Sequence, residues 1–495
     1  MKNLPFLDLA VIALYLIAMV LVGVYFSRKN QSSEQYSKAS GKIPGWAIGL
    51  SIYATFLSSN TFLGVPGKAF GANWNAFVFS LSMPLAAWVA AKYFVPFYRS
   101  TGEVSAYTNL EKRFGAWART YAVACFLLTQ LARMGSIFFG ISLTLQALTG
   151  YSMEMIMLVT GICIIIYTVM GGIEAVIWTE VVQGILKTLG ALLIIAIIVY
   201  NMPGGVSKIV EIGKQDSKFG LGEWSLDFTQ STFWVVLLYG FFINLNNFGM
   251  DQNYVQRYHT ASSAKEASKS VWLCVYIYVP ASFLFFIIGT CLYAYYQANP
   301  ALIEPVKLQA AAERLGAGAS TLDIQSLAAT LKPADYGDKV MPHFMVTMIP
   351  TGLVGLIISA ILSAAMSTIS SGMNASATVF AEDIYKRYIQ RDLSIDKHMR
   401  LLYIATVMFG LAGMVGVKSI LDIWWTLSGI FAGGMLGLFL LGIISRKSGN
   451  AEALAGTIVG IMVILWLSLS YMLPPEYENF KSPLHANMII VVGTL

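Results

Sequence analysis

Residues 47–71 read AIGLSIYATFLSSNTFLGVPGKAFG, an apolar stretch interrupted at its middle by the polar run SSNT (58–61) and further on by Pro66. A helix needs roughly 20 residues to cross a bilayer, and this stretch is longer. Backbone that leaves helical geometry inside a membrane is tolerated only where protein or a water-filled cavity satisfies it. The stretch therefore predicts a spanning helix broken at a buried site, although a kinked helix with polar packing would explain this one segment alone.

A similar interruption occurs five candidate helices later. Residues 233–258 read FWVVLLYGFFINLNNFGMDQNYVQRY, with the polar run NLNNFG (244–249) in the corresponding place. Interrupted segments at matching places in two five-helix halves are typical of transporters built from inverted repeats, whose binding sites lie near the middle of the membrane. Kinked helices explain the pair less well than they explain either segment, so the pair predicts an inverted-repeat transporter.

The composition excludes most other classes of protein. The chain has 495 residues, of which 57% are hydrophobic and only 12% charged, whereas soluble domains carry about 25% charged residues. The formal net charge of +6 is spread over several short loops, which argues against a nucleic acid partner. No nucleophile–base or metal constellation is visible in the sequence, so an enzyme is not expected. A polytopic membrane protein is expected instead.

Apolar runs bounded by Gly, Pro and charged clusters predict thirteen helices, and hence an all-α integral membrane protein. The predicted helices cover residues 5–26, 46–71, 73–98, 117–148, 153–170, 174–200, 231–257, 265–297, 343–383, 397–417, 420–445, 450–474 and 484–495.

Lysine and arginine residues gather in alternate loops, which sets the expected orientation. The basic loops lie at 28–42, 99–113, 257–269, 386–397 and 446–447. They are therefore placed in the cytoplasm and the N-terminus outside, in a multi-pass protein of the cell (cytoplasmic) membrane. The two long connections, 201–230 and 298–342, are then expected to be external loops.

Three hydroxyl groups are predicted to share one helical face. Ser367, Ser370 and Ser371 fall at positions i, i+3 and i+4 of the ninth predicted helix. Hydroxyls combined with carbonyls from an unwound helix suit a sodium ion. Small residues also let membrane helices pack closely, and this helix taken alone favours that explanation.

Arg133 lies near the centre of the predicted span 117–148, more than 20 Å of helix from either end at about 1.5 Å per residue. An arginine at this depth cannot reach water and needs an anion inside the protein. Its planar guanidinium pairs well with a carboxylate, which could belong to another helix or to an anionic substrate. A substrate carboxylate is the slightly favoured partner.

Glu180 and Lys187 lie seven residues apart in one predicted span and so share a face two turns apart. Charged residues inside a membrane are functional candidates by default. Three interpretations remain open: a static ion pair, a carboxylate that ligates a cation, or an ammonium that stands where a cation would otherwise bind.

With these residues identified, the chain resembles the sodium/solute symporter family over nearly all its length. The matching motifs are YTVMGGIEAVIWTEVVQG (167–184), DQNYVQRY (251–258), the serine-rich helix with its AEDIY tail (381–385) and GLFLLGII (437–444). The resemblance implies a fold of the leucine-transporter type, in which ten core helices form two inverted five-helix repeats. The single transmembrane domain (1–495) would then comprise an extra N-terminal helix (5–26), the first repeat (46–200), the second repeat (231–445) and extra C-terminal helices (450–495).

Within the family, the chain is most similar to bacterial sialic acid symporters, through residues 49–70 and the placement of Arg133. The resemblance implies that Arg133 binds the substrate carboxylate. The other implied substrate contacts are Ser58, Ser59, Thr61 and Ser80. The implied main sodium site consists of the carbonyls of Ala54 and Leu57 with Ser367, Ser370 and Ser371. An additional sodium site would use Glu180 with Thr368 and the same three serines.

Three positions depart from the family pattern. Phe56 and Ser80 stand where the sialic acid symporters have a threonine and a glutamine, so recognition of the glycerol tail or N-acyl group is expected to differ. Glu180 stands where aspartate is usual, and Met435 stands where proline is common.

The sequence therefore predicts a secondary active symporter that imports a carboxylated sugar acid, foremost N-acetylneuraminic acid, by alternating access. Sodium is the expected coupling ion, and the expected partners are sodium, an anionic sugar and the lipid bilayer, without nucleic acid or an obligatory protein partner. The alternatives are a sodium-coupled carrier of a hexose, monocarboxylate or amino acid, and a cation-independent or proton-coupled carrier in which Lys187 supplies the charge.

Overall fold

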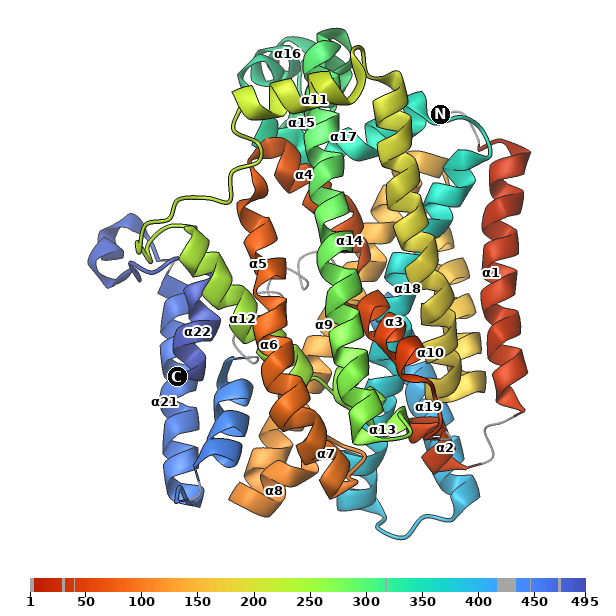
Figure 1. The fold of residues 1–495 in the computed structure, drawn as a ribbon, viewed down its shortest axis with the longest axis vertical. Helices are drawn as coiled ribbons and strands as arrows, with labels where there is room; N and C mark the ends of the chain where they lie inside the picture. The colour runs from red at the N-terminus through yellow and green to blue at the C-terminus, as the bar shows by residue number, and fades with distance from the viewer. Residues whose placement is uncertain are drawn as a thin grey trace.

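The computed structural model describes residues 4–28, 32–39, 41–316, 318–415, 433–445, 447–470 and 473–495, and its elements are helices (Figure 1). Within these residues, eight helices are long and apolar enough to cross a membrane, and a bent pair of shorter helices forms a ninth span. The predicted class, an all-α integral membrane protein, is confirmed.

The first half of the chain contains the broken span and the longest described helix, α10. Its helices are α1 (Phe6–Ser27), α2 (Ser33–Lys38), α3 (Gly45–Phe56), α4 (Ser59–Gly71), η1 (Trp74–Phe77), α5 (Val78–Leu81), α6 (Met83–Val89), η2 (Ala90–Phe94), α7 (Val95–Thr101), α8 (Thr108–Phe114), α9 (Ala116–Thr149), α10 (Met153–Asn201) and α11 (Gly205–Gln215).

The second half contains a second broken helix and the most buried span. Its helices are α12 (Phe233–Met250), α13 (Gln252–Thr260), α14 (Ala264–Ala298), η3 (Pro300–Leu302), α15 (Glu304–Leu315), α16 (Thr321–Thr330), α17 (Pro333–Met348), α18 (Leu353–Val379), η4 (Phe380–Ile389), α19 (Ile395–Met414), Gly433–Ile444, α21 (Asn450–Leu469), η6 (Pro475–Phe480) and α22 (Met488–Thr494). The start of the predicted span 420–445 lies outside the described residues.

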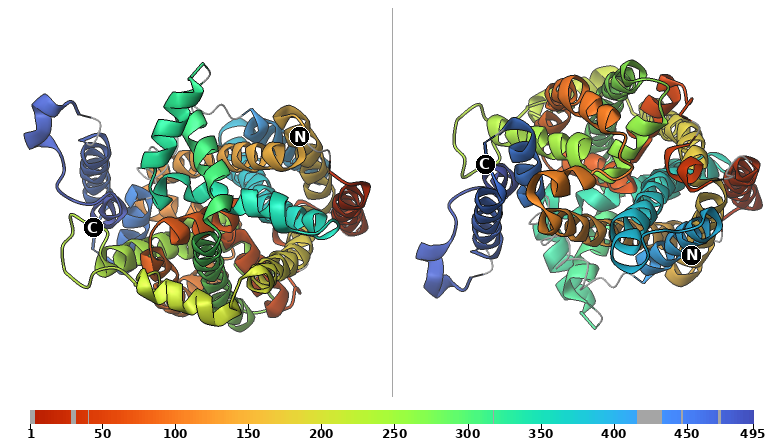
Figure 2. Two further views of the ribbon diagram at one scale, coloured as in Figure 1. Left: turned by 90° about the horizontal axis from the view of Figure 1, so that it is seen from above. Right: turned by 90° about the horizontal axis from the view of Figure 1, so that it is seen from below.

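The broken span lies at the centre of the bundle. Helix α3 packs against α10, α14 and α18. Helix α1 stands at one edge of the molecule and the C-terminal helices α21 and α22 at the opposite edge, as the views from above and below also show (Figure 2). Along the most apolar window of α18, 83% of the residues are buried, against 28% for α1. The polar residues of α18 are therefore shielded by protein.

Helix α10 contains two predicted spans, which meet at Gly172. This glycine has a backbone φ of 56° and ψ of −154°, so one helical run ends there and another begins. A Cβ at this position would lie 2.8 Å from Cδ2 of Tyr36 and 2.9 Å from its carbonyl oxygen. Glycine is thus required both by the positive φ and by the close approach of the short helix α2.

The two long connections join spans as predicted, but they are partly helical. Both segments, 201–230 and 298–342, contain helices, namely α11 in the first and α15, α16 and most of α17 in the second. The span predicted from residue 343 actually starts at Leu353, because Pro350 and Gly352, with a φ of 90°, separate α17 from α18.

The second interruption is also displaced from its predicted place. Helix α12 runs without a break through Asn244, whose amide donates a hydrogen bond to the Ser82 hydroxyl at 3.2 Å. The helix ends at Met250, and Asp251 (φ −76°, ψ 116°) caps α13 by accepting a hydrogen bond from the backbone N–H of Asn253 at 2.9 Å. The asparagines therefore lie within α12, and the helix is interrupted at Asp251 instead.

Candidate functional site

The first broken span leaves helical geometry where the sequence predicted. Helix α3 ends at Phe56 and α4 begins at Ser59, with a bend of 58° between them. Leu57 (φ −90°, ψ 86°) and Ser58 (φ −83°, ψ 171°) lie outside helical geometry. The carbonyls around such a break lack their usual helical donors and are free to bind a cation or another donor.

A lysine ammonium occupies this break. The Nζ atom of Lys187, on α10, donates hydrogen bonds to the carbonyls of Ala54 at 2.6 Å and Leu57 at 2.9 Å. It donates a third to the Ser367 hydroxyl on α18 at 2.8 Å. Ala54, Leu57 and Ser367 form what we call the oxygen cage, and they are residues of the predicted main sodium site. Of the three interpretations of Lys187, the contacts match an ammonium in the place of a bound cation.

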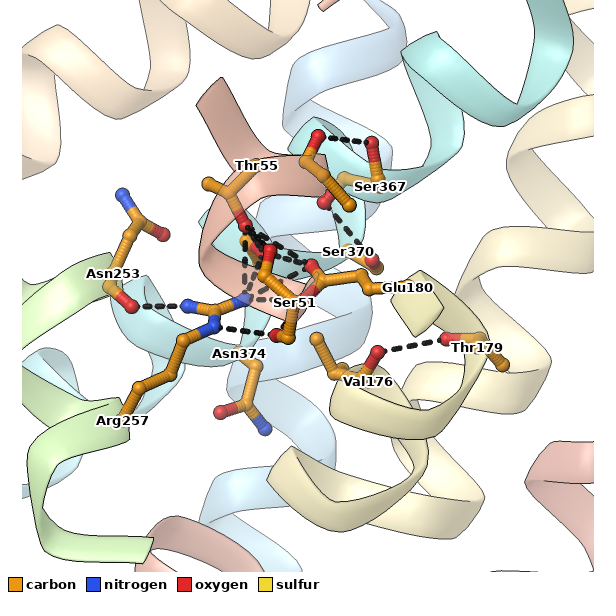
Figure 3. Close-up of polar contacts among 12 residues, drawn as sticks. Ser51, Thr55, Val176, Thr179, Glu180, Asn253, Arg257, Ser367, Ser370 and Asn374 are labelled. Atoms are coloured by element: carbon orange, nitrogen blue, oxygen red, sulfur yellow. Dashed lines mark hydrogen bonds and ion pairs between the residues drawn. The ribbon is translucent and has the colours of Figure 1, made fainter. Parts of the chain in front are cut away.

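A second buried cation faces Glu180. The Arg257 guanidinium lies 2.7 Å from one Glu180 carboxylate oxygen and 2.9 Å from the other. It also donates to the hydroxyls of Ser51 (2.8 Å), Thr55 (3.1 Å) and Ser371 (2.6 Å), as Figure 3 shows for the labelled members. The side chains of Arg257 and Glu180 are 1% and 0% exposed. We call these five residues the buried ion-pair cluster.

Arg257 corrects part of the orientation argument. The sequence placed it among the basic residues of a cytoplasmic loop, but it lies on α13 inside the protein and pairs with a carboxylate 77 residues away. A buried, paired arginine carries no information about which side of the membrane a loop occupies.

Five of the seven residues of the two predicted sodium sites lie in these two groups. The oxygen cage holds Ala54, Leu57 and Ser367, and the buried ion-pair cluster holds Ser371 and Glu180. The Ser370 hydroxyl instead bonds to the carbonyl of Ser367 at 3.3 Å. The Thr368 hydroxyl bonds to the carbonyls of Ala364 at 3.3 Å and Thr55 at 3.5 Å.

Arg133 is another arginine inside the bundle, and its pairing is looser. Its guanidinium lies 3.7 Å from the Asp251 carboxylate, beyond the 2.7–3.2 Å range of a hydrogen bond. The side chains of Arg133 and Asp251 are 24% and 9% exposed. The Tyr254 hydroxyl lies near the guanidinium. The arginine thus has a carboxylate partner at the junction of α12 and α13 and still presents surface to a ligand.

A cavity of about 790 Å³ lies between α4, α5, α12, α14 and α17. Among the predicted substrate contacts, Thr61 and Ser80 line it, and Tyr278 and Ser282 on α14 face them. Ser58, Ser59 and Arg133 are not among its lining residues. The Ser80 hydroxyl lies 2.7 Å from that of Ser282.

An aromatic cluster joins this cavity to Arg133. The Phe56 ring centroid lies 5.5 Å from that of Tyr278, which lines the cavity, and 4.5 Å from that of Tyr254, which lies beside Arg133. Phe248 packs on the same ring at 5.4 Å. Phe56, at one of the positions that depart from the family, is therefore placed between the two halves of the predicted substrate set.

Two charged residues of this region escaped prediction, namely Asp251 and the buried Arg257. Both belong to the motif DQNYVQRY (251–258). One feature of the sequence could have predicted their buried position. The motif directly follows an apolar span and carries an acid and a base six residues apart.

A bundle of membrane-spanning helices with a helix broken near its middle, buried cations at the break and a cavity beside it defines a secondary transporter. The family model described as "Sodium:solute symporter family" matches residues 36–460. The chain belongs to the sodium:solute symporter family, as its motifs predicted.

Similar proteins narrow the class further. The chain is 33% identical to the sodium/sialic acid symporter NanT of Aliivibrio fischeri, over 97% of this chain and 91% of that protein. It is 34% identical to the sodium/sialic acid symporter SiaT of Proteus mirabilis, over 94% and 90%. A solved structure of a Na⁺-coupled sialic acid symporter, in a substrate-bound outward-open state, superposes with a TM-score of 0.85 at 33% identity and covers 99% of this chain and 95% of that one. The relatives are carriers and not enzymes, as predicted for this chain.

Proposed function

We propose that this chain is a symporter that imports a carboxylated sugar acid of the sialic acid type by alternating access. The names of the two bacterial relatives and of the solved structure support this substrate class. Sodium is the coupling ion that the family and those relatives indicate. The Lys187 ammonium fills the oxygen cage, so sodium in that cage takes no part in the proposed cycle.

The observation that carries the substrate proposal is Arg133. A fixed positive charge in mid-membrane, loosely paired with Asp251 and partly exposed, is ready to exchange its partner for a substrate carboxylate. Thr61 and Ser80 then supply hydroxyl groups toward a polyhydroxylated body, and the cavity beside them has room for a sugar of this size.

The two ends of the bundle differ in a way that supports alternating access. The cavity lies toward the end that carries α17. At the opposite end, Arg119 binds Asp383 at 2.6 Å and Glu111 at 2.9 Å, which ties α9 to η4 and α8. We assign the cavity end to the outside and the ion-paired end to the cytoplasm. The N-terminus then lies outside, in the cytoplasmic membrane of a bacterium.

We further propose the repeat boundaries and the substrate contacts that the sequence predicted. Residues 46–200 and 231–445 are the two inverted repeats, flanked by the N-terminal helix and the C-terminal helices. Substrate contacts are assigned to Arg133, Thr61 and Ser80, with Ser58 and Ser59 at the break.

Uptake of labelled N-acetylneuraminic acid into proteoliposomes tests the proposal. We expect saturable uptake above that of protein-free liposomes. At substrate concentrations below half-saturation, uptake should be strongly reduced in Arg133→Ala and retained in Arg314→Ala, which removes an exposed arginine of α15. Each measurement is made with an inward sodium gradient and again with choline replacing sodium, which separates sodium-driven from sodium-independent uptake. Equal uptake by Arg133→Ala and the unaltered chain would contradict the proposal.

A further inference from the structure

The oxygen cage satisfies the whole hydrogen-bonding capacity of one ammonium group. Lys187 has three N–H donors, and Ala54, Leu57 and Ser367 accept one each at 2.6, 2.9 and 2.8 Å. The side chain is fully buried. In the part of the chain that the structure describes, none of these contacts is a carboxylate, so the charge is held by neutral oxygens alone.

The same oxygens would otherwise suit a small monovalent ion. At the break, the carbonyls of Ala54 and Leu57 face one point, and the Ser367 hydroxyl on α18, which also donates to the Ala54 carbonyl at 3.0 Å, completes the set. Carbonyls of unwound membrane helices are typical sodium ligands. An ammonium is a compact point charge that accepts the same oxygen surroundings.

We propose that the Lys187 ammonium is the resident cation of the oxygen cage, in the place that the sequence assigned to a sodium ion, and that the unaltered chain loads no sodium there. A sodium ion on these oxygens would touch the ammonium, and at such a separation inside a protein two like charges repel strongly. The inference deepens the proposed function by assigning the cation of its main site, and rests on that function only where uptake is measured.

The buried ion-pair cluster also contains a cation of the protein where the sequence predicted a sodium ion. The Glu180 carboxylate, which would attract a second ion, is already neutralised by Arg257. The hydroxyls of Ser51, Thr55 and Ser371 are engaged with the same two side chains. Both positions assigned to sodium therefore hold a cation of the protein, and these tethered charges hold α3 against α10, α13 and α18.

Thermal unfolding of the purified full-length protein in sodium chloride and in potassium chloride of equal concentration tests the inference without transport. In the unaltered chain, any difference between the unfolding temperatures in the two salts should not depend on the cage oxygens, because Lys187 occupies them. Lys187→Ala vacates the cage, so it should unfold at a lower temperature that sodium, but not potassium, raises by several degrees. Lys187→Met fills the space without charge and is the matched control, expected to be destabilised equally in both salts.

A variant of the cage itself decides the question even if the lysine variants fail to fold. Ser367→Ala removes one cage oxygen and should leave any sodium response of the unaltered chain, in unfolding or in uptake, unchanged. In the Lys187→Ala background the same substitution should raise the half-saturating sodium concentration about tenfold, the effect of losing one ligand contribution of about 1.4 kcal/mol. A sodium response of the unaltered chain that disappears in Ser367→Ala would overturn the inference.

The two proposals fail separately. If no sialic acid enters the liposomes but the unfolding temperatures follow the expected pattern, the substrate assignment is wrong and the cage assignment stands. If uptake is normal and sodium stabilises the unaltered chain through Ser367, the substrate assignment stands and the cage assignment is wrong.

Discussion

Arg133 and Arg257 are both arginines inside the membrane bundle, yet their surroundings differ. Arg257 is 1% exposed and bonds to a carboxylate and three hydroxyls, whereas Arg133 is 24% exposed and lies 3.7 Å from its acid. A fully bonded arginine is committed to holding helices together, while a loosely paired one can exchange partners. Depth in the membrane alone therefore does not mark an arginine as part of a ligand site. How completely the guanidinium is paired within the protein is the better indicator.

The largest expected effect is loss of the fully bonded arginine. Arg257→Met would leave the Glu180 carboxylate buried without a counter-charge, which costs about 3–5 kcal/mol of folding stability. We expect most of the protein to be lost from the membrane fraction, as measured by fluorescence-detected size exclusion. Glu180→Gln in the same chain should restore part of the yield, because it removes the unpaired charge. A wild-type yield for Arg257→Met alone would refute its structural role.

Removal of the loosely paired arginine should affect transport instead. Arg133→Ala would deprive a substrate carboxylate of its charged partner, a loss of about 2 kcal/mol or more in binding, equivalent to roughly a 30-fold rise in the half-saturating substrate concentration. Its unfolding temperature should stay close to that of the unaltered chain. Unfolding comparable to that of Arg257→Met would mean that the two arginines play the same role.

A smaller effect is expected at Asp251, the acid that pairs loosely with Arg133. Asp251→Asn removes the charge that competes for Arg133, and should lower the half-saturating concentration of an anionic substrate by a few fold, on the order of 0.5–1 kcal/mol. Competition binding with N-acetylneuraminic acid and a neutral hexose separates this effect from a general change, since only the anion should benefit. Weaker binding of the anion would show that Asp251 orients the arginine rather than competing for it.

The smallest effect is expected at Ser371, which donates to Glu180 and accepts from Arg257. Ser371→Ala should lower folding stability by about 1 kcal/mol, the usual contribution of one hydrogen bond. The half-saturating sodium concentration of uptake should be unchanged, because the serine belongs to the buried ion-pair cluster. A clear rise in that concentration would return Ser371 to a sodium site.

The sequence predicted features that depend on local chemistry. The polar run after Leu57 placed the first break, and the glycines near 171–172 separated two spans that the structure shows meeting at Gly172. The spacing of the serines on one helical face, together with the family resemblance, predicted that Ser367 lies near the carbonyls of Ala54 and Leu57. The structure places all three around one cation.

The remaining features depend on contacts between distant segments. The polar neighbours of Arg257 in the sequence predicted a loop residue. In the structure it is buried and paired with Glu180, which is 77 residues away in the chain. The asparagines of α12 predicted a helix break, but α12 is helical through all of them, and the Asn244 amide donates a hydrogen bond to the distant Ser82 hydroxyl. The identity of the cation in the oxygen cage likewise depends on how far the Lys187 side chain reaches.

A cation that is part of the protein also changes the energetics of accumulation. An ion that enters with its substrate down a potential of 100 mV contributes about 2.3 kcal/mol per charge, which corresponds to roughly a 50-fold concentration ratio. The Lys187 ammonium returns with the protein after every cycle and contributes no such work. Each ion site that is occupied by a side chain of the protein therefore lowers the substrate concentration ratio that the carrier can reach. The same side chain keeps the broken helix anchored when the external salt concentration is low.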